Sequence, residues 1–145
     1  MNARIVIVGG GLAAGRLVSE LRDRGYAGGI TVLADEAHLP YERPVLSKGF
    51  MLDQDPIDKA LVRDAAWYAE HDVDVRTGTR VEAVDTVGRT VTAGGENFGY
   101  DELVLATGAR ARHLPMADES GAAVHYLRTW EDAQRLRAAM DPTRR

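Results

Sequence analysis

Cysteine is missing from all 145 residues of the sequence. Without thiols the chain can form no disulfides, no thiolate zinc site and no dithiol relay for electrons. No apolar run approaches the roughly 20 residues that a transmembrane helix requires, and the apolar start of the chain is too short for the core of a signal peptide. The expected location is therefore the cytoplasm.

Positive charge is also in short supply. The 18 lysine and arginine residues are outnumbered by 22 acidic ones, which gives a formal net charge of −4. A charge of this sign argues against a nucleic-acid-binding surface and against a patch for anionic membranes. The four histidines have no spacing that is typical of a metal site, so we expect none.

The length suits a single domain that spans residues 1–145. Residues 5–8 are a run of branched apolar side chains ended by glycines, which is the pattern of a strand buried on both faces. Residues 12–24 have apolar positions at helical spacing, and residues 30–36 predict a second strand. Strand, glycine turn, helix and strand form a βαβ unit, whose two strands lie parallel in one sheet.

The second half of the sequence predicts a different kind of sheet. Prolines discourage helix across residues 37–58, a short helix is predicted over residues 63–70, and a third strand follows it. Residues 80–101 alternate apolar and polar side chains between glycine turns, which predicts a three-stranded antiparallel meander. The meander leads into a strand at residues 102–106 that we expect to be buried. The fold class is α/β, a Rossmann-like domain with a parallel sheet, a βαβ unit and a meander.

The last helix has its own start signal. Thr129 and Asp132 have the spacing of a capping box, with aspartate in place of the usual glutamate. The helix behind them is expected to direct Ala133, Leu136 and Met140 toward the core.

The first glycine turn carries a dinucleotide-binding pattern, Gly9-x-Gly11-x-x-Ala14. Gly9 permits a tight turn, Gly11 lets the backbone approach a pyrophosphate, and Ala14 lets the helix lie close to the strands. Phosphates would then sit at the helix N-terminus, where free N–H groups and the positive end of the helix dipole meet the anion. The spacing alone is weak evidence, but here it lies between a strand and a helix.

An acid at the end of the second strand completes this pattern. Asp35 is the expected acceptor for the ribose hydroxyls of the adenosine, and Glu36 is the alternative. A carboxylate at this point repels a 2′-phosphate, which disfavours NADP. FAD and NAD share the same adenosine diphosphate, so the βαβ unit does not distinguish between them.

Four stretches resemble a known family in their order along the chain, namely "VIVGGGLAAG", "ITVLADEAHLPYERPVLSKGFM", "YDELVLATGARARHLP" and "YLRTWEDAQRLR". Together they are similar to the N-terminal FAD-binding region of putidaredoxin reductases and dioxygenase ferredoxin reductases, which are glutathione-reductase-like flavoproteins with two dinucleotide folds. The resemblance covers nearly the whole chain and implies FAD as the cofactor. It also implies a parent enzyme that passes electrons from NADH through FAD to a ferredoxin or similar iron–sulfur protein.

The same resemblance gives roles to the segment "ERPVLSKGF". Arg43 would lie near the polar part of FAD, and Lys48 near the reactive edge of the isoalloxazine, as the one catalytic candidate. A cation there would stabilise the negative charge of a reduced flavin. The alternative for Lys48 is a solvated loop lysine. Val45 stands where this family commonly has a second proline.

Other positions carried over by the resemblance come from several parts of the chain. Ala13 would contact the cofactor through its backbone, Val81 would face the adenine, and Thr107 and Gly108 would lie near the crossing chain. Arg128 would contact polar groups of the flavin. Val81 is equally well explained as an inward-facing strand residue, and Arg128 as a cap on a carbonyl or a solvated side chain.

The resemblance further implies that the NADH-binding domain, a later Gly-Asp segment that grips the flavin, and a C-terminal domain are absent from these residues. The chain is then not expected to turn over NADH alone. An open sheet edge would favour self-association. Two other functions stay open at this point, a non-catalytic assembly module and an NAD-binding Rossmann domain.

Overall fold

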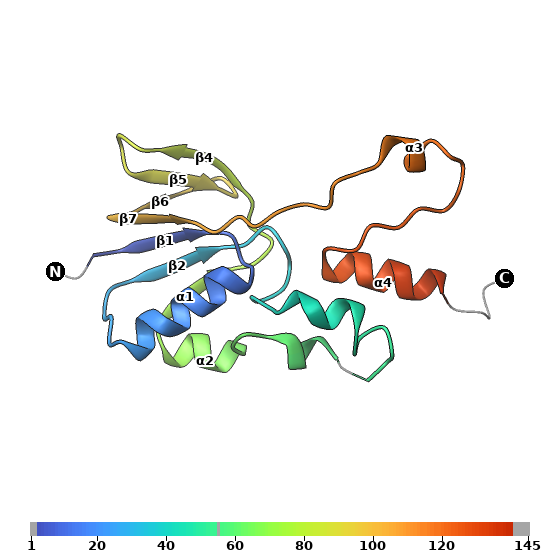
Figure 1. Ribbon diagram of the computed structural model, residues 1–145. Coiled ribbons are helices and arrows are strands. Elements are labelled where there is room, and N and C mark those ends of the chain that lie inside the picture. Colours follow the sequence, from blue (N-terminus) through green and yellow to red (C-terminus); the bar gives the residue numbers. More distant parts are fainter. Residues whose placement is uncertain (1–2, 55, 141–145) are drawn as a thin grey trace. The chain divides into compact units, whose positions relative to one another are not determined.

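The computed structural model describes residues 3–54 and 56–140, which separate into two units (Figure 1). The first unit contains residues 3–42 and 61–108, and the second contains residues 43–54, 56–60 and 109–140. No helix in these described ranges is long and apolar enough to cross a membrane.

The first unit is built on a four-stranded parallel sheet in the order β3-β2-β1-β7. Its strands are β1 (Ile5–Val8), β2 (Ile30–Leu33), β3 (Val73–Arg76) and β7 (Glu102–Leu105). The predicted βαβ unit is confirmed, because β1 and β2 pair in parallel and the helix α1 (Leu12–Asp23) connects them.

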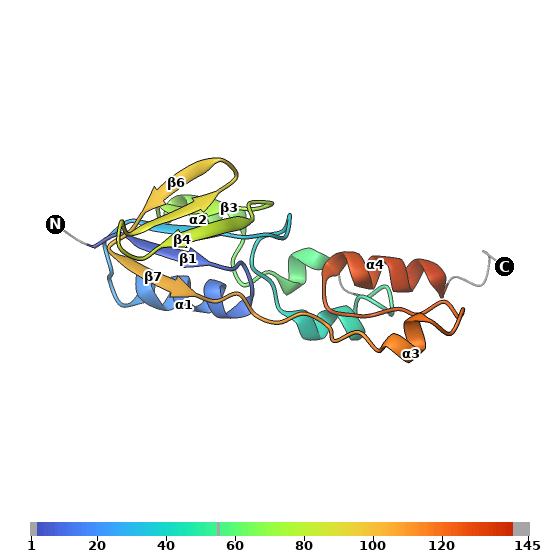
Figure 2. The same ribbon diagram turned by 90° about the horizontal axis from the view of Figure 1, so that it is seen from above.

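Both faces of the sheet are covered, so the first unit has three layers (Figures 1 and 2). One face packs against α1 and the helix α2 (Ala65–Glu70), and the other packs against the meander sheet. Because neighbouring residues of a strand point to opposite faces, β1 supplies both cores. The helix-side core contains Ile5, Ile7, Ala14, Val18, Ile30, Val32, Tyr68 and Val73, and the meander-side core contains Val6, Val8, Leu33, Val91, Ala93 and Tyr100.

The predicted meander is confirmed as a separate antiparallel sheet in the order β4-β5-β6. Its strands are β4 (Val81–Asp85), β5 (Thr90–Ala93) and β6 (Glu96–Gly99). Of the three strands, only β5 has a strongly buried face, which Val91 and Ala93 form. Because side chains alternate along a strand, these two point to the same side and attach the meander to the parallel sheet.

The expectation of a buried strand at residues 102–106 is wrong in one respect. β7 lies at the edge of the parallel sheet and pairs only with β1 among the described residues. The side chain of Leu105 is consequently 67% exposed, although the strand reads as an apolar run. The apolar run does identify a strand, but its burial depends on a neighbouring strand that the described residues do not supply.

A single arginine ties the C-terminal end of α1 to the α2–β3 turn. The guanidinium of Arg22 donates hydrogen bonds to the backbone carbonyls of Tyr26, Gly28, His71 and Asp72. His71 and Asp72 are 49 and 50 residues from Arg22 in the sequence, and the guanidinium fork can satisfy several carbonyls at once. Arg22 therefore fixes the loop that returns the chain to β2.

The helix predicted over residues 63–70 begins two residues later than expected. Asp64 is its N-cap, and the Asp64 carboxylate accepts a 2.8 Å hydrogen bond from the Trp67 N–H. Tyr68 is buried in the core, and its hydroxyl has no hydrogen-bond partner among the described residues. Burial raises the pKa of Tyr68 to about 12, against a smaller opposing effect of the Arg63 charge.

The second unit is largely helical. It contains the short 3₁₀ helices η1 (Arg43–Ser47) and η2 (Ile57–Ala60), the single turn α3 (Pro115–Asp118) and the helix α4 (Trp130–Ala139). Prolines at positions 44 and 56 thus stand at the starts of 3₁₀ turns, where the sequence predicted no helix. Proline permits such turns because its fixed φ suits a first turn.

The core of the second unit joins α4 to the segment that contains η1. The rings of Phe50 and Trp130 lie 4.1 Å apart between centroids, and Ala133 is fully buried. The predicted capping box of α4 is confirmed, but the inward position of Met140 is wrong. Met140 is the C-cap of α4 and is 64% exposed, because the helix ends before its last apolar position reaches the core.

Candidate dinucleotide-binding site

Gly9 occupies the point where the glycine turn leaves β1. Its φ of +117° lies in a region that side chains rarely adopt, and a Cβ built on it would stand 2.1 Å from the Ala106 carbonyl oxygen. The Gly9 N–H still donates to the Leu33 carbonyl at 2.9 Å, so the turn continues the hydrogen bonding of the sheet. Only glycine fits here, for a reason of backbone conformation and of space.

Two further glycines in and just after this turn were not singled out from the sequence. A Cβ on Gly10 would lie 2.3 Å from the Ala34 Cβ, and one on Gly15 would lie 2.8 Å from Pro40 and 3.0 Å from Val62. The absence of a side chain at Gly15 thus lets α1 pack closely against Pro40 and Val62, which belong to the same unit. For Gly10 the signal in the sequence was the run of three glycines, whose middle member the spacing pattern does not use.

Gly11 differs from these neighbours because a Cβ on it would meet nothing within 4 Å. Gly11 is the N-cap of α1, it has ordinary extended backbone angles, and no side chain caps the helix there. No acidic residue stands in the first turn of α1. Since the first N–H groups of a helix have no intrahelical acceptor, this end is an open donor surface with a positive dipole.

The two alanines of the pattern have opposite environments. Ala14 is fully buried in the helix-side core, which agrees with its predicted role in close packing of helix and sheet. Ala13 is exposed at the start of α1, beside the open side of Gly11. A contact of its backbone with the cofactor stays a prediction.

The segment after β7 runs along the same glycine turn. The Ala106 N–H donates to the Val8 carbonyl at 2.8 Å, and the backbone of Ala106 and Thr107 bounds the space beside Gly9. Thr107 and Gly108 are both exposed, and Gly108 has a φ of +69°. The tertiary structure thus brings residues 9 and 107 together, as a crossing chain requires.

The two candidate ribose acids point in different directions. Glu36 accepts a 2.5 Å hydrogen bond from the hydroxyl of Tyr41, a residue that is 1% exposed. Asp35 is turned to solvent, with a side chain 62% exposed, and its Oδ2 lies 3.1 Å from Nη1 of Arg80. Asp35 is the more accessible acid, and Arg80 is a neighbour that the sequence patterns did not reveal.

Val81 packs against the meander-side core from the start of β4. It is only half buried, so part of its surface stays accessible. The packing of Val81 agrees with the alternative of an inward-facing strand residue. A contact of Val81 with adenine stays a prediction.

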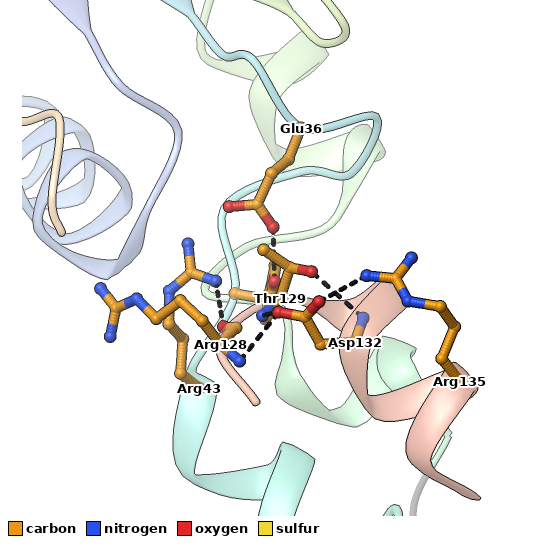
Figure 3. Close-up of polar contacts among 7 residues, drawn as sticks. Glu36, Arg43, Arg128, Thr129, Asp132 and Arg135 are labelled. Carbon is orange, nitrogen blue, oxygen red and sulfur yellow. Dashed lines mark hydrogen bonds and ion pairs between the residues drawn. The ribbon is translucent and has the colours of Figure 1, made fainter. Parts of the chain in front are cut away.

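In the second unit, two predicted site residues that are far apart in sequence are in direct contact. Nη1 of Arg43 donates a 2.7 Å hydrogen bond to the backbone carbonyl of Arg128 (Figure 3). The Arg128 side chain donates from Nε to the Ala109 carbonyl at 3.1 Å. Arg128 therefore caps a carbonyl, which was one of its expected alternatives, and a contact with the flavin stays a prediction.

Asp132 lies beside Arg128 and organises this part of the second unit, as Figure 3 shows. Its carboxylate accepts hydrogen bonds from the backbone N–H groups of Arg128 and Thr129, at 3.0 and 2.8 Å, and pairs with Arg135 at 2.5 Å. Burial raises the pKa of Asp132, but the hydrogen bonds from Thr129 and Arg128 and the charge of Arg135 outweigh it. The pKa of Asp132 therefore lies below its usual range.

Lys48 follows η1 and is exposed. Its backbone takes part in the turn, because the Lys48 N–H donates to the Val45 carbonyl and its carbonyl accepts from Leu52. No hydrogen bond or ion pair of the Lys48 amine is made with any residue that the structure describes. The ammonium is thus available to a ligand, and its catalytic role is a prediction.

This arrangement, with a glycine turn, an open helix N-terminus and an outward acid at the carboxyl ends of parallel strands, is typical of dinucleotide-binding domains. The family model of pyridine nucleotide-disulphide oxidoreductases matches residues 3–145. The chain belongs to this family.

Within this family, the chain is similar to reductases whose names refer to ferredoxin, rubredoxin and putidaredoxin. The ferredoxin–NAD(+) reductase component of the biphenyl dioxygenase system of Paraburkholderia xenovorans is 42% identical over 139 residues, which cover 95% of this chain and 34% of that protein. A rubredoxin–NAD(+) reductase of Pseudomonas putida is 39% identical over 92% of this chain and 35% of its own length. The reductase in the covalent putidaredoxin reductase–putidaredoxin complex has a TM-score of 0.86 at 35% identity, over 95% of this chain and 34% of that one.

The chain spans about a third of the length of the curated relatives it matches, and it corresponds to their FAD-binding part. FAD is the cofactor of this domain, as the resemblance implied. The first unit is compatible with the adenosine diphosphate of FAD, because the side of Gly11 is open and the carboxylate of Asp35 is exposed.

Proposed function

We propose that this chain is the FAD-binding portion of an NADH-dependent ferredoxin reductase. The observation that carries the proposal is the contrast between two glycines of one turn. Gly9 is enclosed by the backbone of Ala106, whereas Gly11 opens onto free space at the uncapped start of α1. A pyrophosphate needs this combination of a rigid turn and an unobstructed row of N–H donors.

The residues proposed to hold FAD divide between its two ends. For the adenosine diphosphate they are the turn residues Gly9, Gly11, Ala13 and Ala14, the acid Asp35 with Glu36 as its alternative, and Val81, Thr107 and Gly108. For the flavin end, the resemblance assigns Arg43, Lys48 and Arg128. FAD, when bound, supplies the acceptance of a hydride from NADH and the release of single electrons.

The role we assign to Lys48 is electrostatic. Its amine has no partner among the described residues, and a positive charge near a flavin stabilises the negative charge of the reduced form. We therefore expect Lys48→Met to lower the reduction potential of bound FAD, and Lys48→Arg to restore most of it. Lys59→Met is the matched control because Lys59 is the other lysine of the chain. Equal potentials in Lys48→Met and the wild type would contradict this role.

The proposed electron acceptor is a ferredoxin or a similar iron–sulfur protein. It is supported by relatives whose names refer to ferredoxin and rubredoxin, and by the complex with putidaredoxin. We also propose that residues 1–145 form one FAD-binding domain, that the chain alone does not turn over NADH, and that it works in the cytoplasm. Fractionation of the native cells would test the location.

FAD titration of the purified chain tests the proposal directly. We expect a saturable change of flavin fluorescence and of the visible spectrum at tens of micromolar FAD or below, since roughly 6 kcal/mol suffices for such an affinity. ADP-ribose should compete, and FAD should bind more tightly than ADP-ribose because of its isoalloxazine end. Equal binding of FAD and ADP-ribose would favour an NAD-binding domain, and a stable protein that takes up neither would favour an assembly module.

Self-association through a sheet edge is a separate proposal. β7 is the edge strand with the longer apolar run, Leu103 to Leu105 after Glu102, and Leu105 is 67% exposed there, whereas β3 carries the ion pair of Asp74 and Arg76. Charged residues protect an edge from further pairing, and apolar ones do not. Sedimentation of the wild type and of Leu105→Lys tests this, with a shift to monomer expected in the variant and no shift contradicting the role of β7.

A further inference from the structure

We propose that Arg80 is a positioning residue for FAD, which fixes the carboxylate of Asp35 in the orientation that accepts the ribose hydroxyls. This inference rests on the proposed function, because it assigns Asp35 to the adenosine end of the cofactor. Arg80 was not among the candidate site residues of the sequence, and it stands one residue before β4. Its role follows from where the fold brings it.

The backbone around Arg80 is tied to the backbone around Asp35. The Thr79 N–H donates to the Ala34 carbonyl at 2.7 Å, and the Gly78 N–H donates to the Glu36 carbonyl at 2.9 Å. These two bonds flank Asp35 on both sides and hold the turn before β4 against the end of β2. Arg80 and Asp35 therefore face each other from two segments that are 45 residues apart in sequence.

The contact between the two side chains uses one oxygen of the carboxylate. Nη1 of Arg80 lies 3.1 Å from Oδ2 of Asp35, and no residue that the structure describes donates a hydrogen bond to Oδ1. A carboxylate offers about four acceptor positions, so this contact orients Asp35 and leaves capacity for the two hydroxyls of a ribose.

Stability alone does not explain the pair. The two side chains are 64% and 62% exposed, and ion pairs of this kind contribute little to folding. A docked ribose would cover the pair and exclude water from it, and the attraction between the charges is stronger in such surroundings. The pair is thus worth more in the complex than in the free protein, which is the property of a residue that acts in binding.

The test compares Arg80→Gln, Arg80→Lys and Asp35→Asn with the double variant of Arg80→Gln and Asp35→Asn. Arg76→Gln is the matched control, because Arg76 pairs with Asp74 at 2.8 Å and is also exposed, but on β3. Each protein is titrated calorimetrically with FAD, ADP, 2′,3′-dideoxy-ADP and 2′,5′-ADP, and its thermal unfolding is recorded without ligand.

We expect Arg80→Gln to weaken FAD and ADP by about fivefold, the scale of one ion pair, and Arg80→Lys to recover part of the loss. In the Asp35→Asn background, Arg80→Gln should change either affinity by less than about twofold. Binding of dideoxy-ADP should be insensitive to substitution of Arg80, because this ligand lacks the two hydroxyls whose hydrogen bonds Asp35 is proposed to accept. Arg76→Gln should bind like the wild type.

Each contrary result identifies what fails. If the wild type binds FAD and Arg80→Gln behaves like Arg76→Gln, the inference is overturned and the proposed function stands. An equal loss from Arg80→Gln with and without Asp35, or tighter wild-type binding of 2′,5′-ADP than of ADP, shows that Arg80 contacts the ligand itself and overturns its positioning role. A wild type that binds neither ADP nor FAD overturns the proposed function and this inference together.

Discussion

The α carbon of Gly9 faces the carbonyl oxygen of Ala106 so closely that a Cβ on the glycine would stand 2.1 Å from that oxygen. Two segments nearly a hundred residues apart are thereby locked at the end of β1. The same turn presents Gly11, whose missing side chain leaves open space. One turn thus contains a glycine for folding and a glycine for binding.

Gly9→Ala is expected to destabilise the fold by roughly 3 kcal/mol or more, because the methyl group meets backbone and the φ of +117° is unfavourable for alanine. Gly25→Ala is the control for the positive φ alone, since Gly25 has a φ of +78° and no atom near its Cβ position. It should cost only about 1 kcal/mol. Urea unfolding measures both, and equal losses would show that the contact with Ala106 is unimportant.

Gly11→Ala separates binding from folding. The φ of Gly11 is −88° and its Cβ position is empty, so the free energy of unfolding should fall by no more than about 1 kcal/mol, the cost of alanine at an N-cap. FAD affinity should fall by roughly tenfold or more, because the methyl group enters the space proposed for the pyrophosphate. Gly29→Ala, whose Cβ would lie 3.7 Å from Arg4, should leave FAD affinity unchanged. Unaltered FAD binding by Gly11→Ala would contradict the proposed phosphate site.

Asp132 makes the stability of the second unit depend on pH. Its folded-state pKa is below the unfolded value, so its contribution is present above the unfolded pKa of about 4 and is lost as the pH falls through the folded value. Asp132→Asn should lower the free energy of unfolding by about 1 kcal/mol at pH 7, and the difference from the wild type should shrink below pH 4.

Thr129→Ala is the comparison for Asp132, because it removes the neutral partner of the same capping box. Its cost should be of similar size at pH 7 and should shrink less than that of Asp132→Asn toward pH 3, because the Thr129 side chain is only one of the groups that lower the pKa of Asp132. Thermal unfolding followed by circular dichroism at each pH records both variants. A cost of Asp132→Asn that stays constant with pH would argue against the charged role of the carboxylate.

Tyr68 carries a buried hydroxyl that has no partner among the described residues. Tyr68→Phe removes this group and should stabilise the protein by up to about 1 kcal/mol at pH 7, because the cost of burying an unpaired hydroxyl disappears. Because the pKa of Tyr68 is raised to about 12, ionisation of the unfolded chain lowers the free energy of unfolding of the wild type as the pH rises from about 10 toward 12, and it has no such effect below about pH 10. Tyr68→Phe should lose less over that interval in denaturant titrations. A large destabilisation at pH 7 would reveal a hydrogen bond to the hydroxyl.

Local patterns were enough to predict the elements that short-range physics controls. The βαβ unit, the meander and the capping box of Thr129 and Asp132 depend on spacing, alternation and turn residues that lie within a few positions of one another. The glycine spacing at the end of the first strand also indicated the dinucleotide-binding turn, and the order of the motifs along the chain indicated the family.

Only the tertiary structure decided which side chains share a surface. Leu105 is exposed because β7 is an edge, Glu36 turns toward Tyr41 while Asp35 faces solvent, and Arg80 meets Asp35 across 45 residues. Burial and pairing between distant segments depend on what the rest of the chain places beside each residue. A local pattern specifies the shape of its own segment, whereas the partner of that segment is set by the packing of the whole sheet.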